Sequence, residues 1–275
     1  MSRKRLTQLF PCLLPLRRKQ RLLFFYWGMS MDKNQYANEI TGVALPHLLF
    51  TSGCPLYNRE TGFDMVYQQN KVFNLKLAAK VLNGLVIKPH ETFSFWQIVR
   101  NADKTTPYKE GLLVSDGVLT TSYGGGMCQM SNLLFWLFLH TPLTIIERHG
   151  HGIKDFPDPP SDAPLGVDAT ILEGWIDLKV RNDTDSSFQI IIAFDDESII
   201  GSIFTNEPVK VSYTVSNDNL SYRREKGKII ETVDVVQYSI SAKTGQKLSS
   251  KVAYRNVCEI GYNLPDTVKV IDKTN

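Results

Sequence analysis

Three consecutive glycines, Gly124, Gly125 and Gly126, stand directly before an apolar stretch that begins near Cys128. Glycine adopts backbone angles that other residues avoid, and it lets another group approach the main chain closely. The run Leu133–Leu139 is rich in leucine and is followed by a proline, which predicts a helix that stops there. The chain is therefore expected to fold around a glycine turn that leads into a buried, cysteine-bearing helix.

A cysteine in the first turn of a helix is favourably placed for nucleophilic chemistry. Unpaired N–H groups and the positive end of the helix dipole stabilise a thiolate there. The amides of a neighbouring glycine turn would then hold a developing oxyanion. Cys128 is thus a candidate nucleophile, and the alternative is that it only packs, as most buried cysteines do.

The composition is that of a folded protein and excludes several classes. The chain has 275 residues, 43% hydrophobic and 21% charged, with a net charge of +3. Its charges are mixed beyond the N-terminus, so we expect no nucleic-acid surface. The four cysteines are scattered without metal-binding or disulfide-scaffold spacing, and we expect no cofactor.

The N-terminal segment bears on location. Leu6–Leu16 is apolar but broken by Pro11 and Pro15, and no small-residue cleavage site follows it. Leu22–Met29 is far shorter than the roughly 20 residues that cross a bilayer. We expect no signal peptide and no transmembrane helix, hence a cytoplasmic or membrane-peripheral protein. The basic and aromatic residues of 3–27 either contact an anionic membrane surface or pack on their own domain.

Hydrophobic periodicity predicts an α+β fold: an N-terminal helical segment, a central domain around the buried cysteine-bearing helix, and an antiparallel β-rich C-terminal half. The expected divisions are a helical and irregular region 1–62, a core domain 63–205 and a β-rich extension 206–275. A helix is expected over 70–83. Strands are expected over 169–171, 175–180, 188–194 and 199–204, and weaker ones over 209–215, 229–240 and 252–258.

A cysteine nucleophile needs a base within hydrogen-bond reach and a group that orients the base. His149 and His151 follow a predicted strand, and if that strand runs through Gly150, alternation places them on one face with Glu147. Either Glu147 or Asp168 would then set the tautomer of the imidazole. The sequence does not decide between the two histidines.

Two other sites compete with this interpretation. His149 and His151 have a spacing suited to zinc, with Asp168 or Cys128 as a further ligand, although no second local pair of ligands supports it. The glycine run also resembles a phosphate-binding turn at a helix start. It lacks the Lys-Ser/Thr dipeptide and the βαβ context of such sites.

Five blocks of this sequence follow one another in a set order: Asn74–Ala79, Pro89–Phe95, Gly124–Ser131, Glu147–His151 and Asp168–Thr170. Together these blocks resemble the VanW family. One departure from the family pattern is His90, which stands where glycine is usual and is expected to strain or reshape a turn.

The resemblance implies an accessory role in glycopeptide (vancomycin) resistance, acting on a peptidoglycan stem peptide or precursor. It also implies L,D-transpeptidase-type acyl transfer, in which Cys128 attacks the carbonyl after the third stem-peptide residue. His151 or His149 would be the base, oriented by Asp168 or Glu147. The alternative is a non-catalytic accessory or binding protein with a structural Cys128. The residues assigned to the oxyanion or the substrate are Gly124, Gly125, Gly126, Gln129 and Arg148.

Overall fold

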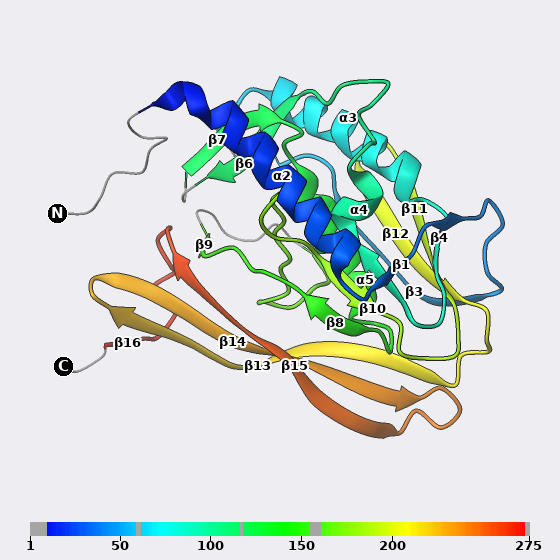
Figure 1. The fold of residues 1–275 in the computed structure, drawn as a ribbon. Coiled ribbons are helices and arrows are strands. Elements are labelled where there is room, and N and C mark those ends of the chain that lie inside the picture. The colour runs from blue at the N-terminus through cyan, green and yellow to red at the C-terminus, as the bar shows by residue number, and fades with distance from the viewer. Residues whose placement is uncertain (1–9, 59–61, 116–117, 155–160, 273–275) are drawn as a thin grey trace.

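The structure, a computed structural model, describes residues 10–58, 62–115, 118–154 and 161–272. It confirms the predicted α+β fold, because helices pack against mixed sheets in the earlier part of the chain and long strands dominate the C-terminal part (Figure 1). Part of the proline-rich stretch before Pro164, at residues 155–160, lies outside the described residues.

The elements follow one another in chain order. The first part of the chain contains η1 (Pro11–Leu13), α2 (Leu14–Met31), β1 (Gln35–Tyr36), β2 (Glu39–Ile40), β3 (His47–Pro55), α3 (Met65–Leu82), β4 (Leu85–Ile87), β5 (Glu91–Ser94) and α4 (Phe95–Val99). The middle contains β6 (Glu110–Ser115), β7 (Val118–Tyr123), α5 (Met127–Phe138), β8 (Thr144–Glu147), β9 (Ile153–Lys154) and β10 (Lys179–Arg181). The last part contains β11 (Phe188–Phe194), β12 (Ser198–Thr205), β13 (Val211–Glu225), β14 (Lys228–Ser241), β15 (Lys247–Ile260) and β16 (Val270–Asp272).

Helix α5 forms the centre of the core, and the predicted start of this helix is confirmed. It begins at Met127, with Gly126 as its N-cap in the left-handed conformation (φ +99°). Nine of its twelve residues are buried. A Cβ at Gly201 of β12 would lie 2.8 Å from Leu137, so the sheet approaches the helix at a position that only glycine permits.

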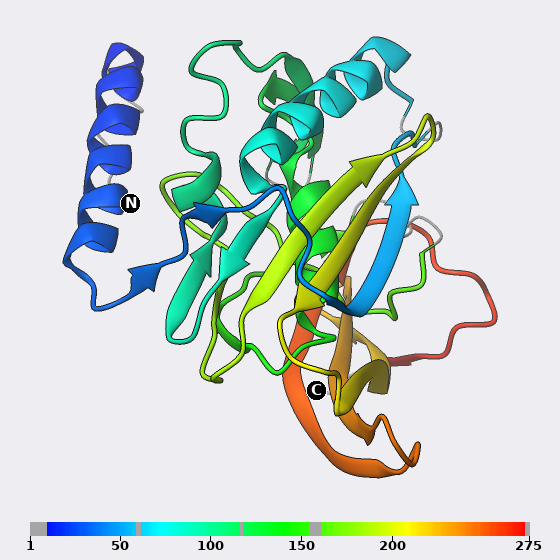
Figure 2. The ribbon, with the colours of Figure 1, turned by 90° about the vertical axis from the view of Figure 1, so that its right-hand side faces the viewer.

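Strand β3 corrects the expectation that residues 1–62 are helical and irregular. It pairs antiparallel with β12, from His47 opposite Thr205 to Pro55 opposite Ser198, and forms one edge of the sheet β2-β4-β11-β12-β3 (Figure 2). Its burial alternates along the strand except at Leu49 and Phe50, where the register with β12 shifts by one residue. Its partners come from far along the chain, so local periodicity did not reveal it.

The predicted C-terminal meander is confirmed in part. Strands β11 and β12 match the predictions over 188–194 and 199–204. The strands predicted over 169–171 and 175–180 are wrong, because the described backbone there forms only isolated bridges until β10 begins at Lys179. Side chains satisfy part of this backbone instead, for example Glu147, whose carboxylate accepts the Asp177 amide at 2.8 Å.

The last three long strands exceed the expected lengths and form the sheet β16-β13-β14-β15-β9. This sheet is attached to the core helix by Gln237 of β14. Its side-chain amide donates to the carbonyls of Leu139 and Thr141 at 2.7 and 3.0 Å, just after α5 ends. The C-terminal sheet therefore caps the end of the helix that carries Cys128.

His90 has a backbone conformation that favours glycine. Its φ is +66°, in the left-handed region that costs a residue with a Cβ about 1–2 kcal/mol. The backbone is held there because the His90 amide donates to the carbonyl of Asn182 at 2.8 Å. His90 was expected either to strain the turn or to reshape it, and its positive φ indicates strain.

The helix predicted over 70–83 is confirmed as α3, and its Asn74 supports the glycine turn. The fully buried amide of Asn74 donates to the carbonyls of Lys109 and Gly125 at 2.9 and 3.0 Å and accepts from the Lys109 amide at 2.8 Å. A Cβ at Gly125 would lie 2.3 Å from the carbonyl oxygen of Gly111. Both contacts hold the turn tightly against the strand β6.

We expect Asn74→Ala to reduce the free energy of unfolding by about 2–4 kcal/mol, because it leaves buried backbone groups of Lys109 and Gly125 without partners. Urea denaturation followed by circular dichroism measures this loss. Asn70→Ala is the matched control, since Asn70 lies one turn earlier and donates only one hydrogen bond, to the Glu110 carbonyl. Equal losses in the two variants would contradict the bracing role of Asn74.

Candidate active site

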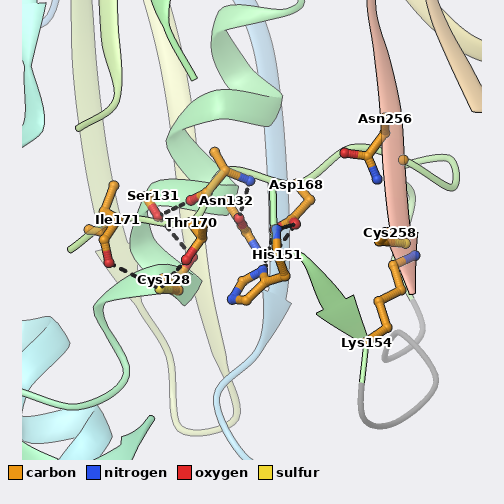
Figure 3. Close-up of polar contacts among 12 residues, drawn as sticks. Cys128, Ser131, Asn132, His151, Lys154, Asp168, Thr170, Ile171, Asn256 and Cys258 are labelled. Carbon is orange, nitrogen blue, oxygen red and sulfur yellow. Dashed lines mark hydrogen bonds and ion pairs between the residues drawn. The ribbon is translucent and has the colours of Figure 1, made fainter. Parts of the chain in front are cut away.

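Cys128 lies in the first turn of α5 and lines a large cavity together with His151, Asp168 and Thr170. Its sulfur is 3.4 Å from the Thr170 hydroxyl and 3.8 Å from the carbonyl oxygen of Ile171 (Figure 3). The side chain is half-buried, so the sulfur is both held in place and accessible from the cavity.

His151 stands between Cys128 and Asp168. Its Nδ1 lies 2.8 and 3.0 Å from the two carboxylate oxygens of Asp168, and its backbone amide donates to the same carboxylate at 2.6 Å. His151 and Cys128 line the same cavity, and each shifts the pKa of the other. Because Nδ1 is engaged by the carboxylate, Nε2 is the ring nitrogen that serves the sulfur. The three side chains form a cysteine–histidine–aspartate arrangement.

Two polar residues of α5 fix the segment that carries Asp168 and Thr170. The Ser131 hydroxyl donates to the carbonyl of Ala169 at 2.5 Å, and the Asn132 side chain accepts from the Ala169 amide at 2.7 Å. Anchoring Ala169 in this way holds the residues on either side of it, Asp168 with its carboxylate at His151 and Thr170 with its hydroxyl at Cys128. Ser131 and Asn132 are therefore positioning residues.

The electrostatics of this site favour an ion pair. Burial alone would raise the pKa of Cys128, but the hydrogen bond and positive charge of His151, with the Thr170 hydroxyl, lower it below the usual thiol value. Burial lowers the pKa of His151, while Asp168 and Cys128 together raise it to about 10. Asp168 is buried, and its pKa is still lowered because His151 binds its carboxylate. These pKa shifts favour a thiolate–imidazolium pair over the neutral thiol and imidazole.

His149 and Glu147 are not brought to Cys128. Strand β8 ends at Glu147, so the assumed continuation through Gly150 is wrong. The Nε2 of His149 lies 3.3 Å from the Glu147 carboxylate, which also pairs with Lys179 at 3.0 Å. His149 is not among the residues that line the cavity.

The two histidines therefore do not share a zinc site. Their rings are directed to different carboxylates, His149 to Glu147 and His151 to Asp168. Among the described residues, no three histidine, cysteine or acidic side chains converge as metal ligands would.

Arg148 supports the site from outside the cavity, because it is not among the residues that line it. Its guanidinium donates to the carbonyl of Asp168 at 2.5 Å and to the Asn256 side chain at 2.7 Å. It also lies over the Tyr254 ring, 4.1 Å from the centroid. Arg148 thus links Asp168 to the C-terminal sheet, and the geometry does not present it to a substrate.

The glycine turn offers fewer free amides than its sequence suggested. The amides of Gly124 and Gly125 donate to the carbonyls of Lys109 and Ser122, at 3.1 and 3.0 Å. These two amides are therefore unavailable for an oxyanion or a phosphate. The amides of Gly126, Met127 and Cys128 have no acceptor within the described parts of the chain, as expected at a helix start.

Gln129 is engaged by strand β3, although it lines the cavity. Its side-chain amide donates to the carbonyl of Pro55 at 2.7 Å and contacts the sulfur of Cys54 at 3.4 Å. Gln129 therefore ties the first turn of α5 to the edge strand of the sheet.

Lys71 of α3 is a site residue that the sequence analysis missed. It lines the cavity with Cys128, and its side chain covers the turn so closely that a Cβ at Gly126 would lie 2.1 Å from its Cγ. Burial lowers the pKa of Lys71 to about 8, and no acidic group in the described ranges forms an ion pair with it. Its position three residues before Asn74, on the face of α3 that meets the glycine turn, was the available signal.

Known proteins share this sequence pattern. Residues 70–204 match the family described as VanW like protein. The chain is 58% identical over 270 residues, 98% of both chains, to a protein of Enterococcus faecalis (strain ATCC 700802 / V583) named Vancomycin B-type resistance protein VanW. It is 29% identical over 141 residues, 51% of this chain and 45% of the relative, to Uncharacterized protein YoaR of Bacillus subtilis (strain 168). No solved structure matches significantly.

These similarities agree with the ordered blocks from Asn74 to Thr170. The match to the Enterococcus protein covers nearly the whole of both chains, so it includes the N-terminal helix and the C-terminal sheet as well as the site. The chain belongs to the VanW family.

Proposed function

We propose that this protein is an accessory protein of glycopeptide resistance that acts on a peptidoglycan stem peptide or its precursor by cysteine-dependent acyl transfer. The observation that carries the proposal is that Cys128 and the hydrogen-bonded pair of His151 and Asp168 line the same cavity, where His151 lowers the pKa of the Cys128 thiol. The name of its E. faecalis relative supports the association with vancomycin resistance.

The first half of the reaction forms a thioester. The Cys128 thiolate attacks the carbonyl carbon after the third stem-peptide residue, and the amides of Gly126 to Cys128 hold the oxyanion. The bond from that carbon to the nitrogen of the terminal D-residue breaks. His151 donates its Nε2 proton to the leaving nitrogen, which departs as an amine.

The second half transfers the acyl group. His151 is now neutral, because it has given its Nε2 proton to the leaving amine. An acceptor amine attacks the thioester carbon and gives its proton to His151. The new amide leaves, and the thiolate–imidazolium pair is restored. Asp168 holds the imidazole orientation through both halves.

Lys71 is a half-buried cation that lines the same cavity as Cys128 and forms no ion pair among the described residues, which suits the free carboxylate of a terminal D-residue. An anion bound there would offset the cost that burial imposes on the ammonium group. The proposed donor is therefore a stem peptide with a free C-terminal carboxylate.

The ionisation of Cys128 tests the nucleophile. We expect its alkylation rate, followed by peptide mass spectrometry, to rise with pH around a midpoint well below the free-thiol value of about 8.5. His151→Ala should move that midpoint upward, and Asp168→Asn should move it part of the way. His149→Ala is the matched control and should leave it unchanged. A midpoint insensitive to His151, or an unreactive Cys128, would favour the non-catalytic scaffold.

The donor is tested by incubating the protein with tetrapeptide stem analogues and measuring the mass of Cys128. We expect a thioester adduct of the first three residues, with release of the terminal D-residue. Lys71→Met should slow adduct formation about tenfold or more, since a charge-assisted hydrogen bond is lost, and leave the alkylation midpoint in place. Equal rates with the amidated and free-carboxylate peptides would contradict the role of Lys71.

A further inference from the structure

Helix α2 exposes large apolar side chains on one side. Leu16, Leu23, Phe24, Trp27 and Met31 are each more than half exposed, and Leu23 and Met31 reach 68% and 69%. Their spacings of four and seven residues place them along one stripe of the helix. No helix among the described residues is long and apolar enough to cross a membrane.

The opposite side of α2 attaches the helix to the body of the protein. Met29 is buried, and the Tyr26 hydroxyl donates to the Glu173 carboxylate at 2.6 Å. The guanidinium of Arg21 lies 4.4 Å from the ring centroid of Trp175. Figures 1 and 2 both show α2 at the periphery of the molecule, with its outer side uncovered. The helix is thus held on one face while the apolar stripe stays free.

The charge of this region is one-sided. No acidic residue precedes Asp32 in the sequence, whereas the segment is rich in arginine and lysine. Cationic side chains next to an apolar stripe on a helix of low overall hydrophobicity are typical of helices that lie in a lipid headgroup layer. The basic residues are Arg3, Lys4, Arg5, Arg17, Arg18, Lys19 and Arg21.

We propose that α2 binds an anionic phospholipid surface and lies in its plane. The apolar stripe from Leu16 to Met31 enters the boundary between headgroups and acyl chains, with Trp27 at the depth that indole rings prefer. Arg17 and Lys19, beside the stripe, pair with lipid phosphates. A second copy of this chain fits less well, because two such cationic helices would repel one another.

This docking places the candidate active site at the membrane. Arg18 and Arg21 of α2 line the same cavity as Cys128, and Glu173, which holds Tyr26, lines it too. A bilayer under α2 therefore brings the cavity beside the lipid headgroups. This position of the cavity favours a membrane-anchored peptide precursor over the polymerised wall as the acyl donor, an inference that rests on the proposed function.

Sedimentation of the full chain with vesicles tests the docking. We expect binding to vesicles of equal phosphatidylglycerol and phosphatidylcholine, and at least tenfold weaker binding to phosphatidylcholine alone. Leu23→Ser/Phe24→Ser/Trp27→Ser should abolish binding without a loss of thermal stability, because these side chains are exposed. Arg17→Glu/Lys19→Glu should remove the preference for the anionic vesicles.

The matched control is Leu248→Ser/Val252→Ser/Val257→Ser, which removes three apolar side chains of similar exposure from β15 and should bind as the wild type does. The proposal is overturned if this control variant loses as much vesicle binding as the α2 variant does. It is also overturned if the wild-type protein does not bind the anionic vesicles. A wild-type dimer that becomes a monomer in the α2 variant, with no vesicle binding, assigns the stripe to a second copy. Cys128→Ser should bind vesicles normally, so failed docking and failed chemistry are distinguished.

Discussion

A buried helix cannot satisfy the polar groups of its own ends, and this constraint shapes the protein around α5. At its start, Gly126 takes a left-handed conformation and Asn74 holds the preceding turn through buried hydrogen bonds. At its end, Gln237 reaches from the C-terminal sheet to the free carbonyls. The amides of Gly126 to Cys128, which have no acceptor in the part of the chain that the structure describes, lie at the cavity. The one end of the helix left polar is thus the place where chemistry is possible.

The same helix gathers the charged groups of the site. Ser131 and Asn132 fix the backbone at Ala169, which determines where the Asp168 carboxylate lies. A buried carboxylate is costly unless it is paired, so its two hydrogen bonds from His151 are a condition of its burial. Arg148 extends this dependence to the C-terminal sheet, because it binds the Asp168 carbonyl and Asn256 together. The C-terminal sheet is therefore part of the support of the site, even though no residue of its long strands lines the cavity.

Helix α2 has one side toward the cavity and the other toward solvent. Its packed side meets the cavity through Arg18 and Arg21, and its free side carries an apolar stripe with cations beside it. One helix thus joins a surface suited to lipid and a cavity suited to a peptide. The absence of a spanning helix among the described residues is compatible with this arrangement, because an interfacial helix needs no such length.

The sequence by itself determined the features that arise from local chemistry. Three glycines before a leucine-rich run predicted the turn and the start of α5, and strict alternation predicted β11 and β12, because these signals are complete within a few residues. The ordered blocks likewise indicated the family. His151 and His149 remained equivalent because two residues of one short segment cannot reveal which distant carboxylate each will meet.

Only the tertiary structure decided that choice, by anchoring Asp168 to α5 so that it faces His151 and leaving Glu147 to His149. It also decided that Arg148 is a brace, that Lys71 lines the cavity and that β3 belongs to the central sheet. Each of these depends on contacts between segments far apart in the chain. Periodicity and motif spacing report the immediate neighbours of a residue, whereas these roles are set by which distant backbone and side-chain groups the fold brings within hydrogen-bond reach.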